Sequence, residues 1–397
     1  MVTIDKIFHA SVVLKGIIRP TPLAKAYGIA EDCALYLKPE CLQKTGSFKL
    51  RGSGYKIAML SDEEKAKGVI ACSAGNHAQG VALAASKCGI SSLICLPDTA
   101  PISKVEATKG YGAQVCLVPG VYDDAYNKAL ELKEEHGYTF VHPFDDEYVI
   151  AGQGTIGLEI MNEMSDVDAV LVPIGGGGLI SGVACAIKSI SPHVKVYGVQ
   201  AAGAPSMYNA IHHGKMEALT SVSTIADGIA VKKPGELTYE MVKNYVDDIA
   251  LVTEDEIAAA ILALIEKQKM IAEGAGAVSV AAAMFHKFPL EGKKVVSLIS
   301  GGNIDVTSLS RVIDRGLMKS GRTTSLLIEL ADKPGQLMEV SRIIAQCGGN
   351  VISVHHERNG ETESINGCYL RLSLETRNYD HVQQITQALR DAGFKIV

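Results

Sequence analysis

The most informative segment of this chain is residues 169–182, which read AVLVPIGGGGLISG. The apolar run 169–174 is typical of a strand that is covered on both faces, and the residues after the glycines predict a helix. The consecutive glycines at 175–178 remove every side chain where a backbone could wrap a phosphate at a helix N-terminus. A flexible structural loop is the alternative interpretation. Because no Gly-Lys-Ser or Gly-Lys-Thr follows, a nucleotide P-loop is disfavoured.

The same alternation of short apolar runs and helical segments extends from about residue 35 to 310. A helix is expected at 78–87, and capping boxes at Ser61 and Thr253 predict two helix starts. Further strands are expected at 69–72, 93–96, 114–118, 139–141, 194–200 and 295–300. The number of β/α units is larger than one sheet usually contains. We therefore expect two α/β lobes with a cleft between them, the smaller at roughly 45–150.

Residues 325–397 follow a different order, and a polar linker at 319–324 is expected to separate them from residues 1–318. The pattern predicts β, α, β, β, α and β elements, which is the ferredoxin-like arrangement. Their expected ranges are 325–330, 336–347, 350–356, 367–374, 379–392 and 394–397.

Composition narrows the class of protein. The chain has 397 residues, 47% hydrophobic and 21% charged, which fits two or three globular domains. A net charge of −6 gives no basic field for nucleic acid, and no run of residues is long and apolar enough for a membrane helix. The nine cysteines lack metal-binding spacing, and the N-terminus lacks a signal-peptide pattern, so we expect a cytoplasmic protein with reduced thiols.

Lysine chemistry is indicated in the segment KTGSFKLRG, residues 44–52. Lys49 follows Phe48 and is close to glycines, so an apolar wall could desolvate its amine and favour the neutral form. A neutral lysine can form a Schiff base with a carbonyl cofactor and later move protons. An ordinary basic surface turn is equally compatible with this segment alone.

Two polar segments follow predicted strands and complete the candidate site. SAGNH at 73–77 opens a helix, where backbone N–H groups could bind a carboxylate or a phenolate oxygen, although Ser73 or Asn76 could simply cap the helix. SGGN at 300–303 ends a strand, where Ser300 could hydrogen-bond a neutral ring nitrogen or merely form a tight turn.

Taken together and in this order, the segments resemble the fold-type II pyridoxal-phosphate enzymes, most of all the threonine dehydratases (threonine ammonia-lyases). The shared segments are RPTPL at 19–23, GSFK at 46–49, SAGNH at 73–77, GGGG at 175–178, TIADG at 224–228, EGAGA at 273–277 and SGGN at 300–303. The C-terminal unit, with DKPGQL at 332–337, is similar to an ACT domain, a regulatory module that binds amino acids. The resemblance implies a two-lobed catalytic region like the tryptophan synthase β subunit.

The resemblance also implies roles for individual residues. Lys49 would hold pyridoxal 5′-phosphate covalently and act in catalysis, and Phe48 would pack near the cofactor ring. Asn76 would hydrogen-bond the phenolic oxygen, and Ser300 would meet the pyridine nitrogen. The phosphate would be bound by Gly175, Gly176, Gly177, Gly178 and the amide of Leu179. The substrate carboxylate would be bound by Ser73, Gly75, Asn76 and His77.

The implied reaction eliminates water from L-threonine to give an enamine, which water then hydrolyses to 2-oxobutanoate and ammonia, with L-serine to pyruvate as a side activity. Serine racemases usually carry a serine where this chain has Ala74, which disfavours racemisation but leaves serine dehydratase open. Cysteine synthases carry a different loop at 73–77. A non-catalytic amino-acid sensor is the alternative from another class.

The resemblance also implies how the protein is regulated and whether it binds a divalent metal ion. We expect a homotetramer with feedback by isoleucine or valine, or activation by AMP, and Gly348, Gly349 and Asn350 fit an effector site. Relatives with a divalent cation carry a glutamate where this chain has Gln200, so no bound metal is expected there.

Overall fold

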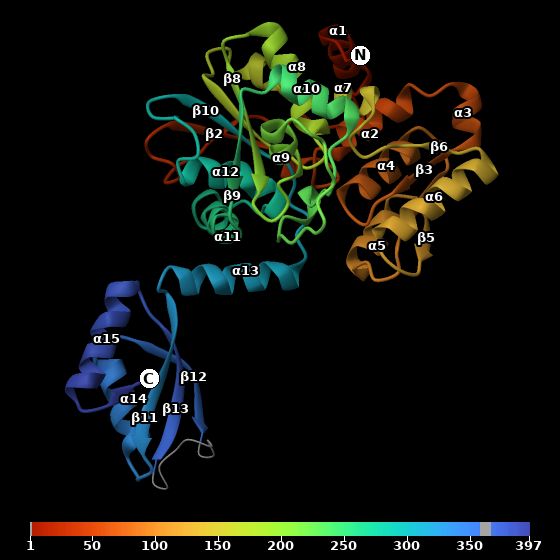
Figure 1. Cartoon of the computed structure of the whole chain (residues 1–397). Coiled ribbons are helices and arrows are strands. Elements are labelled where there is room, and N and C mark those ends of the chain that lie inside the picture. Colours follow the sequence, from red (N-terminus) through yellow and green to blue (C-terminus); the bar gives the residue numbers. More distant parts are fainter. Residues whose placement is uncertain (1, 358–366) are drawn as a thin grey trace. The chain divides into compact units, whose positions relative to one another are not determined.

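The computed structural model describes residues 2–357 and 367–397 and divides into two compact units, Met1–Asp305 and Val306–Val397 (Figure 1). The division at Asp305 precedes the boundary expected near 318, because helix α13 (Val306–Lys319) belongs to the second unit. Of the expected linker 319–324, the last two residues already form part of strand β11.

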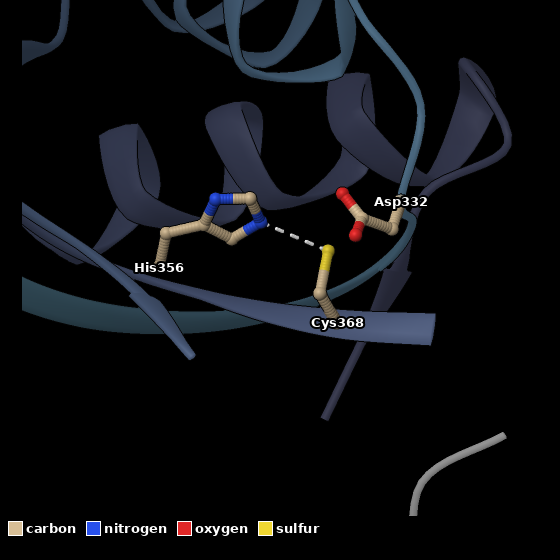
Figure 2. A group of neighbouring side chains, drawn as sticks. All are labelled: Asp332, His356 and Cys368. Carbon is tan, nitrogen blue, oxygen red and sulfur yellow. Dashed lines mark hydrogen bonds between the residues drawn. The ribbon is translucent and has the colours of Figure 1, made fainter. Parts of the chain in front are cut away.

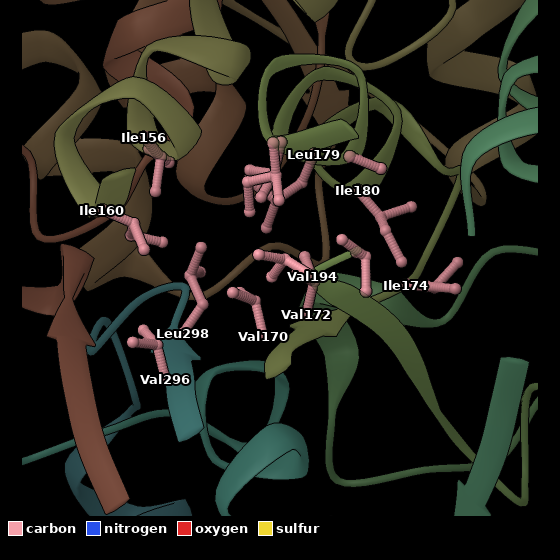
Figure 3. Packing of buried hydrophobic residues seen from close by; sticks show 14 of the residues in the cluster. Ile156, Ile160, Val170, Val172, Ile174, Leu179, Ile180, Val194, Val296 and Leu298 are labelled. Carbon is pink, nitrogen blue, oxygen red and sulfur yellow. The ribbon is translucent and has the colours of Figure 1, made fainter. Parts of the chain in front are cut away.

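A six-stranded sheet organises the larger lobe of the first unit, and all of its strands are parallel except β1. Its order is β1 (Ala24–Lys25), β2 (Ala34–Pro39), β10 (Lys294–Ile299), β7 (Ala169–Pro173), β8 (Lys195–Ala201) and β9 (Asp248–Val252). Helices α7 (Glu147–Glu163) and α8 (Gly178–Ile190) pack their apolar residues onto one face (Figure 3). Helix α12 (Gly274–Met284) also contacts β10, β7 and β8. Every residue of β7 is buried, as its uninterrupted apolar run predicts.

A four-stranded parallel sheet organises the smaller lobe. Its order is β5 (Gln114–Val118), β4 (Ser92–Pro97), β3 (Val69–Cys72) and β6 (Thr139–Phe140). Alternate residues of β3 pack in two different clusters, Val69 and Ala71 with α4 (Asn76–Lys87) and Ile70 and Cys72 with α6 (Tyr122–His136). The sheet is therefore covered on both faces, which explains its short apolar strands.

The remaining helices of the first unit connect these layers. They are α1 (Ile4–Val13), α2 (Lys49–Ala58), α3 (Asp62–Lys67), α5 (Ile102–Gly110), α9 (Ser206–His213), α10 (Glu236–Tyr245) and α11 (Glu254–Ala263). Both expected capping boxes are present, at Ser61 and Thr253. In the described part of the chain, no helix has the length and apolar character needed to cross a membrane.

The second unit has the expected βαββαβ order and an antiparallel sheet. The sheet order is β12 (Asn350–Glu357), β13 (Gly367–Glu375), β11 (Thr323–Ala331) and β14 (Lys395–Ile396). Helices α14 (Gln336–Gln346) and α15 (Tyr379–Asp391) bury their apolar faces against it. This is the ferredoxin-like arrangement.

Candidate active site

Lys49 begins helix α2 beside the carboxyl end of strand β10. An isolated antiparallel bridge pairs Ser47 with Gly301, and the Phe48 amide donates to the Ser300 carbonyl at 3.1 Å. These bonds fix the segment before the lysine to the loop after β10. The structure therefore brings together Lys49, Phe48 and Ser300, which are far apart in the sequence.

The Lys49 amine is held by a neutral partner. Its Nζ donates to the carbonyl of Pro143 at 2.8 Å and lies 5.2 Å from the centre of the Phe48 ring. Burial lowers the pKa of Lys49 to about 8, and the negative charge of Glu273 opposes this change only in part. At pH 7 about one tenth of such an amine is neutral, far more than for an exposed lysine. The apolar wall expected from Phe48 is therefore present.

The partner of the amine belongs to a rigid turn after strand β6. The His142 ring accepts hydrogen bonds at Nδ1 from the amides of Phe144 (3.2 Å) and Asp145 (2.7 Å). Burial lowers the pKa of His142, which keeps the ring neutral and able to accept. The Asp145 carboxylate accepts from the amides of Glu236 and Thr238 at the start of α10, both at 3.1 Å. This turn therefore fixes the Pro143 carbonyl relative to both lobes.

The glycine loop is tightly packed on its outer side. A methyl group at Gly176 would overlap the Phe144 ring, and one at Gly178 would lie 2.7 Å from the Phe144 carbonyl oxygen. Gly177 has φ +96° and precedes α8, and the Gly176 carbonyl accepts from Oγ1 of Thr238 at 2.6 Å. The loop is thus a fixed turn rather than a flexible one. It leads into α8, whose first N–H groups have no partner within the helix.

Asn76, the first residue of α4, is oriented by two side chains. Its Nδ2 donates to Oε1 of Glu273 at 2.6 Å, and its Oδ1 accepts from Nδ2 of Asn303 at 2.7 Å. One hydrogen of the Asn76 amide group is left for a ligand. Burial, assisted by the charge of Asp227, raises the pKa of Glu273 to about 7. A proton at this carboxyl group is therefore gained or lost near neutral pH.

The loop before α4 has free space beside the backbone of Gly75, whereas the His77 ring is buried. Ser73 Oγ accepts from the Gly75 amide at 3.1 Å, and a methyl group at Gly75 would meet no atom within 4 Å. His77 is 3% exposed and its Nε2 lies 2.8 Å from the Val141 carbonyl, while its Nδ1 has no partner among the described residues. Burial, and then the charge of Lys49, lower the pKa of His77 to about 3. The ring is therefore neutral, and His77 can offer an anion only its backbone N–H.

Ser300 is buried directly after β10. Its Oγ donates to the Ala275 carbonyl at 3.1 Å. The single hydroxyl proton is therefore engaged, and a ring nitrogen would receive it only after the hydroxyl turns. Gln200, at which no bound metal is expected, is also buried and donates from Nε2 to the Ile174 carbonyl at 3.3 Å.

These residues fit a phosphate-bearing aldehyde. The chain offers a partly neutral amine, a glycine turn at a helix N-terminus, and an amide with one free hydrogen. Sequence reasoning gave no role to Glu273 and Asn303, although both are in segments that carry the resemblance, and it missed Pro143 and Phe144. Pro143 and Phe144 could have been found from the sequence, because they belong to a loop with His and Asp directly after a predicted strand.

The chain is similar in sequence to known proteins. The family model described as "Pyridoxal-phosphate dependent enzyme" matches residues 14–301. The chain is 51% identical over 398 aligned residues to an L-threonine ammonia-lyase of Thermotoga maritima, covering 100% of this chain and 99% of that protein.

Two solved structures show similar folds. Threonine deaminase isoform 2 of Solanum lycopersicum has a TM-score of 0.73 and 39% identity, covering 78% of this chain and 93% of its own. Serine racemase of maize has a TM-score of 0.75 and 36% identity, covering 80% and 98%.

Proposed function

The chain belongs to the pyridoxal-phosphate-dependent enzyme family, and from this premise we propose that it is a threonine ammonia-lyase. It converts L-threonine to 2-oxobutanoate and ammonia and acts more slowly on L-serine. The observation that carries the proposal is the Lys49 amine, which is desolvated and donates to a carbonyl rather than to a carboxylate. The similarity over the full length to an L-threonine ammonia-lyase supports the choice of substrate.

Lys49 supplies the proton transfer. Pyridoxal phosphate, when bound, supplies an electron-withdrawing ring that makes the α-proton of an amino acid removable. The Lys49 amine would take this proton, because its lowered pKa leaves a useful neutral fraction near neutral pH. The Pro143 carbonyl orients Nζ without adding a charge that would raise the pKa.

Backbone amides bind and orient the substrate. The N–H groups of the first turn of α4, next to the open loop at Ser73 and Gly75, would bind the substrate carboxylate. The neutral His77 ring holds this turn to the Val141 carbonyl and does not compete for the anion.

Elimination is favoured over other reactions by two side chains. A hydroxyl group at Ser300, unlike a carboxylate, would not stabilise a protonated pyridine nitrogen of the bound cofactor, which would favour elimination over transamination. Ala74 offers no hydroxyl group to return a proton from the opposite side, so racemisation of L-serine is disfavoured.

The direct test is release of 2-oxobutanoate and ammonia from L-threonine by the protein saturated with pyridoxal phosphate. Chiral analysis of serine recovered from the same assay distinguishes a racemase, which the solved racemase structures make the second candidate. Absence of 2-oxobutanoate, or accumulation of D-serine at a rate similar to pyruvate, would overturn the proposal.

The second unit is proposed to regulate this activity as an ACT-like domain within a homotetramer. Its βαββαβ order supports the regulatory role, and the effector would be isoleucine, valine or a nucleotide such as AMP. A methyl group at Gly349 would lie 2.8 Å from Ile385, so this glycine serves helix packing as well. Removing residues 321–397 should abolish the effector response but leave turnover, and analytical ultracentrifugation measures the assembly. A response that survives the deletion would contradict the regulatory role.

A further inference from the structure

Three side chains of different types converge in the second unit, outside the candidate active site. Asp332, His356 and Cys368 each offer one ligand atom, and these three atoms lie within 4.8 Å of one another (Figure 2). We propose that they bind one zinc ion or a similar borderline divalent ion. This site is independent of the proposed function, and among residues 2–357 and 367–397 it is the one such group of metal-binding side chains.

The antiparallel sheet itself creates the convergence. Cys368 on β13 pairs with Leu330 on β11, and His356 on β12 pairs with Leu370 on β13. Because side chains alternate between faces, His356 and Cys368 share the face of the buried Leu370. Asp332, two residues after Leu330, follows β11 on the same side. Neighbouring strands thus fix the backbone positions of His356 and Cys368, and Asp332 directly follows the third strand.

The distances suit a tetrahedral ion. His356 Nε2 lies 3.0 Å from Cys368 Sγ. Ligands at about 2.0–2.3 Å from zinc are roughly 3.3–3.8 Å apart in a tetrahedron. Side-chain rotations of His356 and Asp332, which are both exposed, are enough to open this spacing. The Cys368 sulfur is fixed, since the residue is buried and its thiol donates to the Leu330 carbonyl at 3.7 Å.

The donor types select the ion. One thiolate, one imidazole and one carboxylate suit zinc, whereas magnesium and calcium prefer oxygen ligands alone. Binding replaces the thiol proton of Cys368, which passes to solvent, and the two anionic ligands then balance the two positive charges of the ion. Lys333 lines the same cavity and opposes a cation, so the thiolate charge is essential to the site. Three protein ligands leave a fourth position for water.

Metal binding is measured on the full-length protein after chelation and dialysis. The apo protein is titrated with Co²⁺ while the visible and near-ultraviolet spectrum is recorded, and bound Zn²⁺ is counted by elemental analysis. The variants are His356→Ala, Asp332→Asn and Cys368→Ser. The matched controls are His355→Ala, whose side chain projects from the opposite face of β12, and Cys347→Ser, another thiol of the same unit.

We expect one Zn²⁺ per chain and a thiolate-to-cobalt charge-transfer band in the wild type and both controls. His356→Ala should lose the band and bind Zn²⁺ at least about 100-fold more weakly, since even removal of outer-shell partners costs 10–100-fold. Because His356 is exposed, this variant should keep its far-ultraviolet circular dichroism, and Zn²⁺ should no longer raise its unfolding temperature. Zinc bound equally by wild type and His356→Ala, or no cobalt–thiolate band in the wild type, would overturn the proposal.

Discussion

Lys49 and Arg51 are two residues apart on helix α2, yet Arg51 is paired with carboxylates and Lys49 with a neutral carbonyl. The Arg51 guanidinium is 0% exposed and donates to Glu40 (2.8 Å from both Nε and Nη2) and to Glu159 (2.7 and 2.9 Å). The Lys49 amine, by contrast, donates to the Pro143 carbonyl. These carboxylates hold the pKa of Arg51 above its ordinary value, whereas burial lowers that of Lys49.

The ion-paired residues stabilise the fold, whereas Lys49, which has no carboxylate partner among the described residues, is suited to proton transfer. Lys38, also buried, pairs with Glu159 at 2.7 Å and Glu163 at 3.1 Å, which extends the Arg51 network across β2 and α7. Charges that are paired in this way fix the elements around the site. An amine that lacks such pairing can lose its proton near neutral pH, which is what nucleophilic and base chemistry require.

The largest effect is expected at the unpaired amine. Lys49→Ala should reduce 2-oxobutanoate formation by about 10⁴-fold, the upper end of the contribution of a positioned acid or base. It should also abolish the visible absorbance of the covalently bound cofactor. Lys44→Ala, in the same basic segment but bonded to the carbonyls of Gly16 and Ile17, is the control and should retain both. Equal activity of the two variants would remove the distinction drawn for Lys49.

A large stability effect is expected at the paired charge. Glu40→Gln leaves the Arg51 guanidinium only partly compensated in the interior and should lower the free energy of unfolding by about 3–5 kcal/mol. Urea denaturation measures this. Glu63→Gln, which breaks the exposed pair with Lys67, should change stability little. A loss in Glu40→Gln no greater than in this control would show that the network does not support the scaffold.

A moderate effect is expected at the glycine loop. Gly176→Ala forces a methyl group against the Phe144 ring, and overpacking of this kind costs about 1–3 kcal/mol. Weaker binding of pyridoxal phosphate, measured by fluorescence titration, is the expected result. Gly110→Ala, where a methyl group meets no atom within 4 Å, should bind as the wild type does. Phe144→Ala added to Gly176→Ala should restore part of the loss; if it does not, the contact is not the cause.

The smallest effect is expected in the pH dependence of the rate at which the cofactor loads onto Lys49. Only the neutral Lys49 amine attacks an aldehyde, so the rate at which pyridoxal phosphate loads onto the apo protein should rise with pH through a midpoint at about pH 8 and level off above it. The Glu273 carboxylate raises the pKa of Lys49, so Glu273→Gln should move this midpoint to lower pH. Stopped-flow absorbance measures both profiles. A midpoint near that of an ordinary exposed lysine, or a shift to higher pH in the variant, would contradict the role given to burial and to Glu273.

Much of the fold was predictable because it depends on local patterns. The strands expected at 69–72 and 114–118 are confirmed to the residue, and the strand expected at 139–141 is confirmed to within one residue. Uninterrupted apolar runs predict strands that are covered on both faces of a sheet. Ser61 and Thr253 predict helix starts, because each caps its helix through a hydrogen bond with a residue three positions later. The glycine turn was recognisable for the same reason.

The partners of the site were not predictable. Lys49 and Pro143 are 94 residues apart, Asn76 and Glu273 are 197 apart, and Arg51 and Glu159 are 108 apart. No local pattern indicates which carbonyl or carboxylate will face a given charge. His77 illustrates this, since its place in the loop at 73–77 predicted a carboxylate-binding residue but its ring is directed to the Val141 carbonyl.

The sequence by itself determined the alternation of strands and helices and the glycine turn, because each depends on neighbouring residues, and it made Lys49 a candidate for the reactive amine. Only the tertiary structure decided that this amine meets a carbonyl while Arg51, two residues later, meets carboxylates. The reason is physical: the pKa of a buried group depends on desolvation and on the charges that the fold places around it.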